Sequence, residues 1–167
     1  DDTIAILSGI RDARLRWSSG PDGGVVDAVN KGLAAARGAI LSIQSSDDVF
    51  APGAVNSAVD ALLREPHVGL VYGDVALIDH NSDKIGEDVQ GPFDLDLLLG
   101  RLAYIPQPGT FFTRAALTRA GAWRPHVSYV ADADLWIRIA LDFPVRKLNR
   151  VLAGYRYHDA QRDKHRM

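Results

Sequence analysis

The chain has 167 residues, 47% of them hydrophobic and 24% charged, and its net charge at pH 7 is -2. This length and balance predict one soluble globular domain over residues 1–167, and the charge gives no indication of a nucleic-acid partner. The absence of cysteine excludes disulfides, thiolate metal sites and a cysteine nucleophile. It is compatible with a reducing cytosol, so we expect a cytoplasmic location.

The first residues predict a short helix that no strand precedes. Asp2 and Thr3 fit a helix start before the apolar residues 4–7, and the chain does not begin with methionine, so the sequence reads as a piece of a longer protein. No apolar run reaches the roughly 18 to 20 residues that span a bilayer. The basic end at residues 162–166 predicts either a frayed terminus or contact with the inner face of a membrane.

Apolar residues at helical spacing alternate with short apolar runs between turn formers. Helices are predicted at residues 27–37, 52–65, 93–102, 114–120 and 132–141. Strands are predicted at residues 15–18, 39–44, 68–72 with a continuation at 75–79, 110–113 and 146–157. Pro52 is expected in the first turn of its helix, and Gly38 is expected to end the preceding helix in the left-handed conformation. The alternation predicts an α/β sheet with parallel strands, in which ligands bind at the carboxyl ends of the strands.

The polar loop Ser45-Ser46-Asp47-Asp48 directly follows one of these predicted strands. Adjacent carboxylates there form a hard-oxygen site suited to Mg²⁺ or Mn²⁺. Regular strand geometry would point the two side chains to opposite faces, so we expect Asp48 to touch the ion and Asp47 to reach it through water or to bind a ligand hydroxyl. The alternative is that one of them caps the following helix.

The order of several short motifs resembles family 2 glycosyltransferases. Residues 21–32 read P-D-G-G-V-V-D-A-V-N-K-G, which is very similar to the family's P-D-x-G-x-x-D-A-x-N-K-G. Two positions depart from the family pattern, with Ser45 in place of asparagine and Ala131 in place of an acid. The other matching segments are A-R-G at 36–38, S-S-D-D at 45–48, P-G-A at 52–54, V-Y-G-D at 71–74, Q-P-G-T-F-F at 107–112, A-D-A-D-L-W-I-R at 131–138 and Y-R-Y-H at 155–158.

This resemblance implies the GT-A fold, a Rossmann-like, mostly parallel sheet flanked by helices. Family members begin with a strand, a helix and a second strand that hold the nucleotide base, followed by a G-S-x-D-x-T turn. Residues 1–3 match only the tail of that turn. We therefore expect a domain that is incomplete at its N-terminus and lacks about two strands and the base-binding aspartate.

The resemblance also implies a reaction. A sugar would pass, with inversion, from a nucleotide-diphosphate donor to the hydroxyl of a carbohydrate or lipid-linked sugar, in polysaccharide or glycoconjugate synthesis. Mn²⁺ or Mg²⁺ would stabilise the departing diphosphate, and Asp48 with Asp47 would hold the ion. His158 matches a third metal ligand of some GT-A enzymes, and its alternative is a solvated histidine that follows a strand.

Asp132 matches the family's catalytic aspartate, which would take the proton from the attacking hydroxyl. Its alternative is a plain helix cap, since it lies at a predicted helix start. The helix dipole at that place favours the ionised carboxylate, so an apolar wall or a nearby acid would be needed to make it more basic. Asp134 is expected to face elsewhere and to pair with an arginine.

The donor side of the site would include Asp22, Asp27, Asn30 and Lys31, together with Asp47. Asp22 matches a family residue near the nucleotide, with a turn aspartate as its alternative. Asp27 and Asn30 would face the donor from a helix; a cap and a solvated amide are their alternatives. Lys31 would add a cation near the diphosphate, and its alternative is a solvated side chain.

Residues 107–110 would shape the acceptor or sugar pocket, through Gln107, Gly109 and Thr110, with a structural loop as an equal alternative. Trp123 lies in a turn-rich segment and is a candidate for stacking on a sugar. Trp136, beside apolar neighbours on a predicted helix, is expected in the core.

Two other functions remain open at this stage. A nucleotidyltransferase also combines an α/β sheet with metal-binding acids, but it usually has a glycine-rich basic phosphate loop near its start, and this sequence shows none. The second is a noncatalytic GT-A-like binding module, which the expected loss of N-terminal strands and Ala131 both allow.

Overall fold

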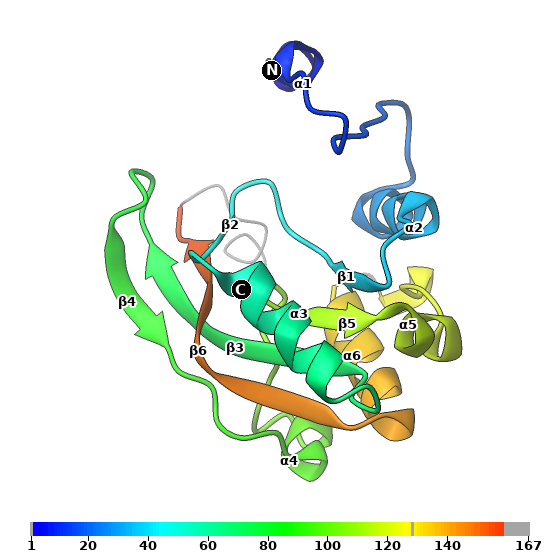
Figure 1. Ribbon diagram of the computed structural model, residues 1–167, viewed down its shortest axis with the longest axis vertical. Helices are drawn as coiled ribbons and strands as arrows, with labels where there is room; N and C mark the ends of the chain where they lie inside the picture. The colour runs from blue at the N-terminus through cyan, green and yellow to red at the C-terminus, as the bar shows by residue number, and fades with distance from the viewer. Residues whose placement is uncertain (1, 128, 159–167) are drawn as a thin grey trace.

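The computed structural model describes residues 2–127 and 129–158, which form a six-stranded sheet with helices on both faces (Figure 1). The helices are α1 (Thr3–Gly9), α2 (Val25–Ala35), α3 (Ala54–Arg64), α4 (Leu95–Leu99), α5 (Arg114–Ala120), α6 (Ala131–Asp142) and the 3-10 turn η1 (Pro125–Val127). The strands are β1 (Ile40–Ser42), β2 (Val49–Phe50), β3 (Leu70–Ile78), β4 (Lys84–Asp88), β5 (Phe111–Thr113) and β6 (Val145–Arg156).

The sheet has the order β1-β5-β3-β6-β2, and β4 pairs with the far half of β3. The α/β class is confirmed, but a mostly parallel sheet is wrong for the described strands. Only β3 and β6 pair in parallel among them, and the other pairs are antiparallel. The cause is β5, which lies between β1 and β3 and runs antiparallel to both, so that β1, β3 and β6 share one direction.

Alternation along the central strands divides the core between the two faces of the sheet. Leu70 and Phe112 face a large cluster that α6 fills with Trp136, whose ring centroid lies 5.4 Å from that of Phe112. Val71 and Phe111 face a smaller cluster under α3. A fully buried apolar side chain contributes roughly 1.5 to 3 kcal/mol, so these faces hold the sheet between its helices. The prediction that Trp136 lies in the core is confirmed.

Several predicted elements differ in their bounds. Residues 15–18 form no strand, and α1 buries no residue and lies apart from the sheet (Figure 1). Helix α2 ends at Ala35, so Gly38 is not its cap and its φ is not positive, contrary to expectation. Helix α3 begins after Gly53, whose φ of 74° is left-handed, so Pro52 precedes the helix rather than entering its first turn.

Strand β3 is continuous through Gly73 and Asp74, where the sequence suggested an interruption, but its pairing with β6 shifts register on both sides of Asp74. The Asp74 carboxylate pairs with Lys147 of β6 at 2.9 Å and accepts the main-chain amide of Gln90 at 2.9 Å. These contacts satisfy an otherwise costly charge inside the sheet.

Strands β2 and β4 were not predicted: β2 has two residues, and β4 reads K-I-G-E-D without an apolar face.

One row of paired residues crosses four strands. Asp88 of β4 is paired with Val75 of β3, Val75 with Ala153 of β6, and Ala153 with Phe50 of β2. Phe50 follows Asp48 by two residues, so main-chain pairing links the two regions that carry Asp88 and the aspartate loop.

None of the helices in the described part of the chain has the length and apolar character that a membrane crossing requires.

Candidate active site

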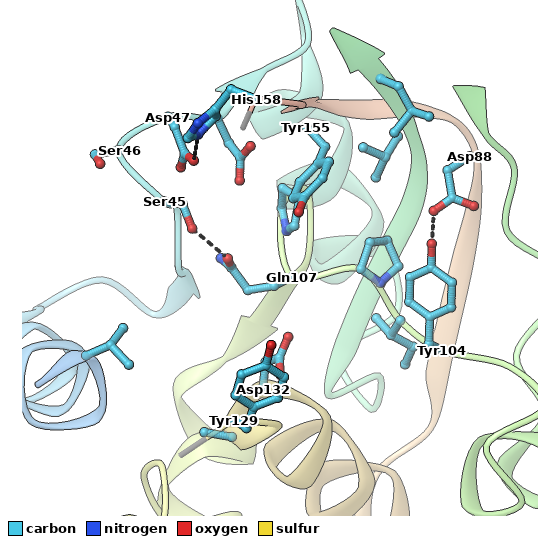
Figure 2. Close-up of a pocket in the computed structure, with 18 of the residues that line it drawn as sticks. Ser45, Ser46, Asp47, Asp88, Tyr104, Gln107, Tyr129, Asp132, Tyr155 and His158 are labelled. Atoms are coloured by element: carbon cyan, nitrogen blue, oxygen red, sulfur yellow. Dashed lines mark hydrogen bonds and ion pairs between the residues drawn. The ribbon is translucent and has the colours of Figure 1, made fainter. Parts of the chain in front are cut away.

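A cavity of about 740 Å³ opens where the aspartate loop, the end of β6 and the start of α6 converge (Figure 2). Asp47 and Asp48 enter it from the loop after β1, Asp132 from the first turn of α6, and Gln107 from the segment before β5. The structure thus brings these four predicted site residues to one cavity. His158, just beyond β6, also lines the cavity.

Asp48 is nearly buried, with 9% of its surface exposed, and its Oδ1 accepts the main-chain amide of Arg156 at 2.9 Å. Burial raises the pKa of Asp48 to about 6, and the charge of Asp47 adds to the rise while the amide of Arg156 opposes it. Neither aspartate caps α3, whose N-cap is Gly53 without a side-chain bond, so the cap alternative is wrong.

Asp47 contacts His158, whose Nε2 lies 3.1 Å from its Oδ2 (Figure 2). The main-chain oxygen of Asp47 accepts the Nε of Arg156 at 2.8 Å. The other end of the same guanidinium donates to the carbonyl oxygen of Asp79 and, at 2.9 Å, to the hydroxyl of Ser82. Arg156 therefore ties the aspartate loop to the turn between β3 and β4.

The side chains at this end of the cavity, two carboxylates and an imidazole, are of the kinds that bind a divalent cation. Asp47 and His158 now contact each other directly, at 3.1 Å, so an ion held by both would have to replace that contact. A cation would also offset the burial and charge that raise the pKa of Asp48. Within residues 2–127 and 129–158, no group of three or more acidic, histidine or cysteine side chains is gathered closely enough to hold an ion.

Asp132 lies on the floor of the cavity, below Gln107 and beside Tyr129 (Figure 2). It is the second residue of α6 rather than its N-cap, which is Val130, and its Oδ1 accepts the amide of Ala133 at 2.8 Å. Asp134 pairs with Arg138 at 2.8 Å, which confirms the predicted pairing with an arginine. Asp132 lines the cavity and Asp134 does not.

Gln107 spans the gap between two loops. Its Nε2 donates to the carbonyl oxygen of Ile43, and its Oε1 accepts the hydroxyl of Ser45 at 3.1 Å. Gly109 and Thr110 lie behind it: Gly109 has a φ of 76° and a Cβ there would meet the Cβ of Leu152 at 3.0 Å, while the buried Thr110 hydroxyl donates to Pro106 at 2.5 Å. These two residues support the loop, and Gln107 is its member in the cavity.

Trp123 lines the cavity, although only 9% of it is exposed and it packs into the core. Asn30 exchanges two hydrogen bonds with its backbone, donating to the carbonyl oxygen at 2.9 Å and accepting the amide at 3.0 Å. The alternative of a solvated Asn30 is therefore wrong, and its side chain positions the wall of the cavity. A role in donor binding stays a prediction for Asn30, as stacking on a sugar does for Trp123.

Three further residues expected on the donor side lie outside the cavity lining, as Asn30 does. Asp22 accepts the amide of Gly24 at 2.8 Å, as a turn aspartate does. Asp27 accepts the amide of Gly23 at 2.9 Å and pairs with Lys31 at 2.7 Å. The ion pair holds the pKa of Asp27 below its usual value. Nucleotide contact by these three residues stays a prediction.

Sequence reasoning missed part of the cavity lining. Asp88 lies at the end of the unpredicted strand β4 and accepts the hydroxyl of Tyr104 (Figure 2). Tyr129 and Tyr155 add two further phenol rings. Tyr155 and Arg156 lie in the Y-R-Y-H segment, which was a signal for the site, whereas Asp88 and Tyr104 carry no motif. The basic end at 162–166 lies outside the described residues.

Known proteins are similar to this chain in sequence and in fold. A glycosyltransferase of Mycobacterium tuberculosis, described as uncharacterized, is 34% identical over 146 residues, which are 84% of this chain and 53% of the relative. Chondroitin synthase of Escherichia coli is 24% identical over 154 residues, 90% of this chain and 22% of that enzyme. The chain thus spans about half the length of the first relative and less of the second.

Among solved structures, S. aureus TarS in complex with UDP-GlcNAc is similar with a TM-score of 0.69 and 15% identity, over 96% of this chain and 48% of TarS. This likeness confirms the GT-A fold. The family model for glycosyl transferase family 2 matches residues 1–121, which is well over half of the chain. The resemblance first visible in the ordered motifs is therefore confirmed, and the chain belongs to glycosyl transferase family 2.

Proposed function

We propose that the cavity is the catalytic site of an inverting, metal-dependent glycosyltransferase, which moves a sugar from a nucleotide-diphosphate sugar to an acceptor hydroxyl. The observation that carries this proposal is that Asp132 lines the same cavity as Asp47 and Asp48, from a different element. Membership of the family supports a transferase and makes a nucleotidyltransferase a poorer explanation. The chondroitin synthase among the relatives supports a place in polysaccharide or glycoconjugate synthesis.

The carboxylates then divide between two roles, metal binding and proton transfer. Asp47, Asp48 and His158 would hold Mn²⁺ or Mg²⁺, which supplies positive charge to the departing diphosphate when bound. Asp132 accepts the proton of the acceptor hydroxyl. At the same time, the oxygen of that hydroxyl bonds to the anomeric carbon from the side opposite the diphosphate. The bond from that carbon to the diphosphate breaks, and its electron pair leaves with the diphosphate.

Water exclusion is the second requirement, because a competing water would hydrolyse the donor. Trp123 closes one wall of the cavity and is itself positioned by Asn30. Gln107 fixes the loop that carries Ser45 against the loop that precedes β5. These contacts hold the aspartate loop and the Trp123 wall in place at the cavity.

The test is donor turnover by the full-length protein with Mn²⁺ and a panel of uridine, guanosine and thymidine diphosphate sugars. We expect release of the nucleoside diphosphate from at least one donor and loss of that release on chelation. Turnover of no donor, in a protein that is folded and binds Mn²⁺, would reject the enzyme and favour a noncatalytic binding module. Turnover that survives chelation would reject the role of the metal.

A further inference from the structure

The wall of the cavity opposite the aspartate loop is built from residues that the proposed reaction has not yet used. Asp88 enters it from the end of β4 and Tyr104 from the segment before β5, and the Tyr104 hydroxyl donates to Asp88 Oδ2. Figure 2 shows this pair across the cavity from Asp47 and His158. We call Asp88 and Tyr104, with the neighbouring apolar side chains of Val75, Leu77 and Ile105, the far wall.

The far wall combines an apolar surface with hydrogen-bonding groups. The ring of Tyr104 gives an exposed apolar surface, and Leu77 and the largely buried Val75 and Ile105 lie beneath and beside it in the lining. Asp88 adds a carboxylate that can accept two hydrogen bonds, and the phenol hydroxyl can both donate and accept. A sugar ring presents a C–H face together with a rim of hydroxyls, so it can use both kinds of surface at once.

An aliphatic alcohol fits this wall less well. Its chain would cover the Asp88 carboxylate without returning a hydrogen bond, so the lone pairs that Tyr104 and Gln90 leave unused would lose water without a replacement, which is costly. Burial already raises the pKa of Asp88, so its environment disfavours the charge. A hydroxyl donated by a sugar offsets that cost, whereas an alkyl chain adds to it.

The position of Asp132 indicates that the acceptor, rather than the donor, contacts the far wall. It lies on the floor between the aspartate loop and the Asp88–Tyr104 pair (Figure 2). The attacking hydroxyl must be within hydrogen-bond reach of the base, and the donor diphosphate belongs beside Asp47 and Asp48. The body of the acceptor then extends from Asp132 away from the donor, which is toward the far wall.

We propose that Asp88 and Tyr104 form the acceptor subsite, and that the acceptor group it binds is a sugar ring whose hydroxyls bond to these two side chains. This inference rests on the proposed glycosyl transfer for its place in the reaction, and it assigns the side chains that select the acceptor. Strand β4 holds Asp88 in register with Val75, so the carboxylate is presented by the sheet rather than by a loose loop.

The test measures sugar binding directly and does not need a donor. Saturation-transfer NMR on the full-length protein uses methyl glycosides of glucose, galactose, mannose, rhamnose and N-acetylglucosamine, with 1-propanol as the alcohol that lacks a ring. The variants are Asp88→Asn and Tyr104→Phe. The matched control is Glu87→Gln, since Glu87 adjoins Asp88 on β4, pairs with Lys84 and lies outside the cavity lining.

We expect at least one glycoside to bind and 1-propanol not to bind. Asp88→Asn should weaken the glycoside about tenfold, Tyr104→Phe less, and Glu87→Gln not at all, since hydrogen bonds to a charged group are the stronger ones. Unchanged binding in both Asp88→Asn and Tyr104→Phe, or failure of every glycoside to bind the wild type, would overturn the subsite. An octyl glycoside that binds more tightly than the methyl one would identify a lipid-linked ring, and equal binding would identify a ring of a sugar chain; both support the subsite.

Donor turnover separates this inference from the proposed function. If the wild type turns over a donor and Asp88→Asn leaves both glycoside affinity and the acceptor KM unchanged, only the subsite is rejected. If no donor is turned over but Asp88→Asn weakens glycoside binding, the sugar site stands and the catalytic proposal fails. Circular dichroism and Tm of each variant establish that the compared proteins are folded.

Discussion

The Nε of Arg156 donates a hydrogen bond of 2.8 Å to the main-chain oxygen of Asp47, 109 residues earlier in the chain. The main-chain amide of the same arginine binds the neighbouring carboxylate of Asp48. One residue at the end of β6 therefore fixes both the backbone and a side chain of the loop that would hold the metal. This makes Arg156 a positioning residue, with no contact to the reacting atoms required.

Replacement of Arg156 should loosen the metal site before it affects the rest of the fold. In Arg156→Lys the main-chain bond to Asp48 stays, but the planar group that reaches Asp47, Asp79 and Ser82 at once is lost. We expect the Kd for Mn²⁺, measured by isothermal titration calorimetry, to rise about tenfold. The control Arg150→Lys alters another arginine of β6, which contacts Ser57 of α3 and should leave the Kd unchanged. Equal effects of the two variants would contradict the positioning role.

Asp48 should destabilise the metal-free protein at neutral pH. Its pKa is raised from 3.8 to about 6 in the folded chain, so ionisation costs folding free energy above pH 6 and costs none well below pH 4. Asp48→Asn keeps an oxygen for the amide of Arg156 and removes the charge. The variant should gain stability over the wild type as pH rises from 4 to 6, up to at most about 3 kcal/mol.

Urea unfolding in the presence of a chelator, at several pH values from 4 to 7.5, measures this difference. Saturating Mn²⁺ should reverse the order of stability at pH 7.5, because the ion binds the folded wild type and not the variant. A stability difference that does not change with pH would show that the Asp48 carboxyl titrates at its ordinary pKa.

Asp132→Asn should separate binding from chemistry. The amide keeps the size of the carboxylate but cannot accept the proton, so we expect kcat to fall by roughly 10² to 10⁴ while the donor Kd stays within about threefold. The control Asp142→Asn lies at the other end of α6, where the carboxylate pairs with Arg119 on the surface. Transfer at wild-type rate in Asp132→Asn would remove this residue from the role of base.

Asn30→Ala should weaken the fold through Trp123. The change removes both hydrogen bonds to the Trp123 backbone and leaves an amide and a carbonyl in a largely buried setting. We expect a loss of about 2 to 4 kcal/mol in the free energy of unfolding and a change in tryptophan fluorescence of the native state. Asn56→Ala, on the exposed side of α3, is the control and should lose much less. A native fluorescence spectrum unchanged in Asn30→Ala would show that these bonds do not position the indole.

Local sequence predicts those parts of the fold that local chemistry decides. The apolar run that becomes β3 and the helical spacing around Trp136 were identifiable because burial sets both patterns. Strand β4 was not, because its order comes from pairing with β3 and its own residues have no apolar face. Tertiary contact decides such an edge strand, and Asp88 was missed with it.

The candidate site divides in the same way. Asp48 and Asp132 lie in short motifs that match the family pattern, so the sequence alone predicts them as site residues. The bond from Arg156 to Asp48 joins residues 108 apart, and no local pattern encodes it. The motif match predicts that Asn30 binds the donor. Its described hydrogen bonds are instead to the backbone of Trp123, because helix α2 packs against the segment that carries the indole.

The row of paired residues from Asp88 to Phe50 has a consequence for how acceptor choice can change. Three strand spacings of roughly 4.8 Å separate the backbones at its two ends, so the span from the far wall to the strand beside the aspartate loop is about 14 Å. Main-chain hydrogen bonds set that span, and substitutions at Asp88 or Tyr104 leave those bonds in place. If the far wall binds the acceptor as we propose, exchange of side chains there would change which acceptor binds, while this span of the sheet stays the same.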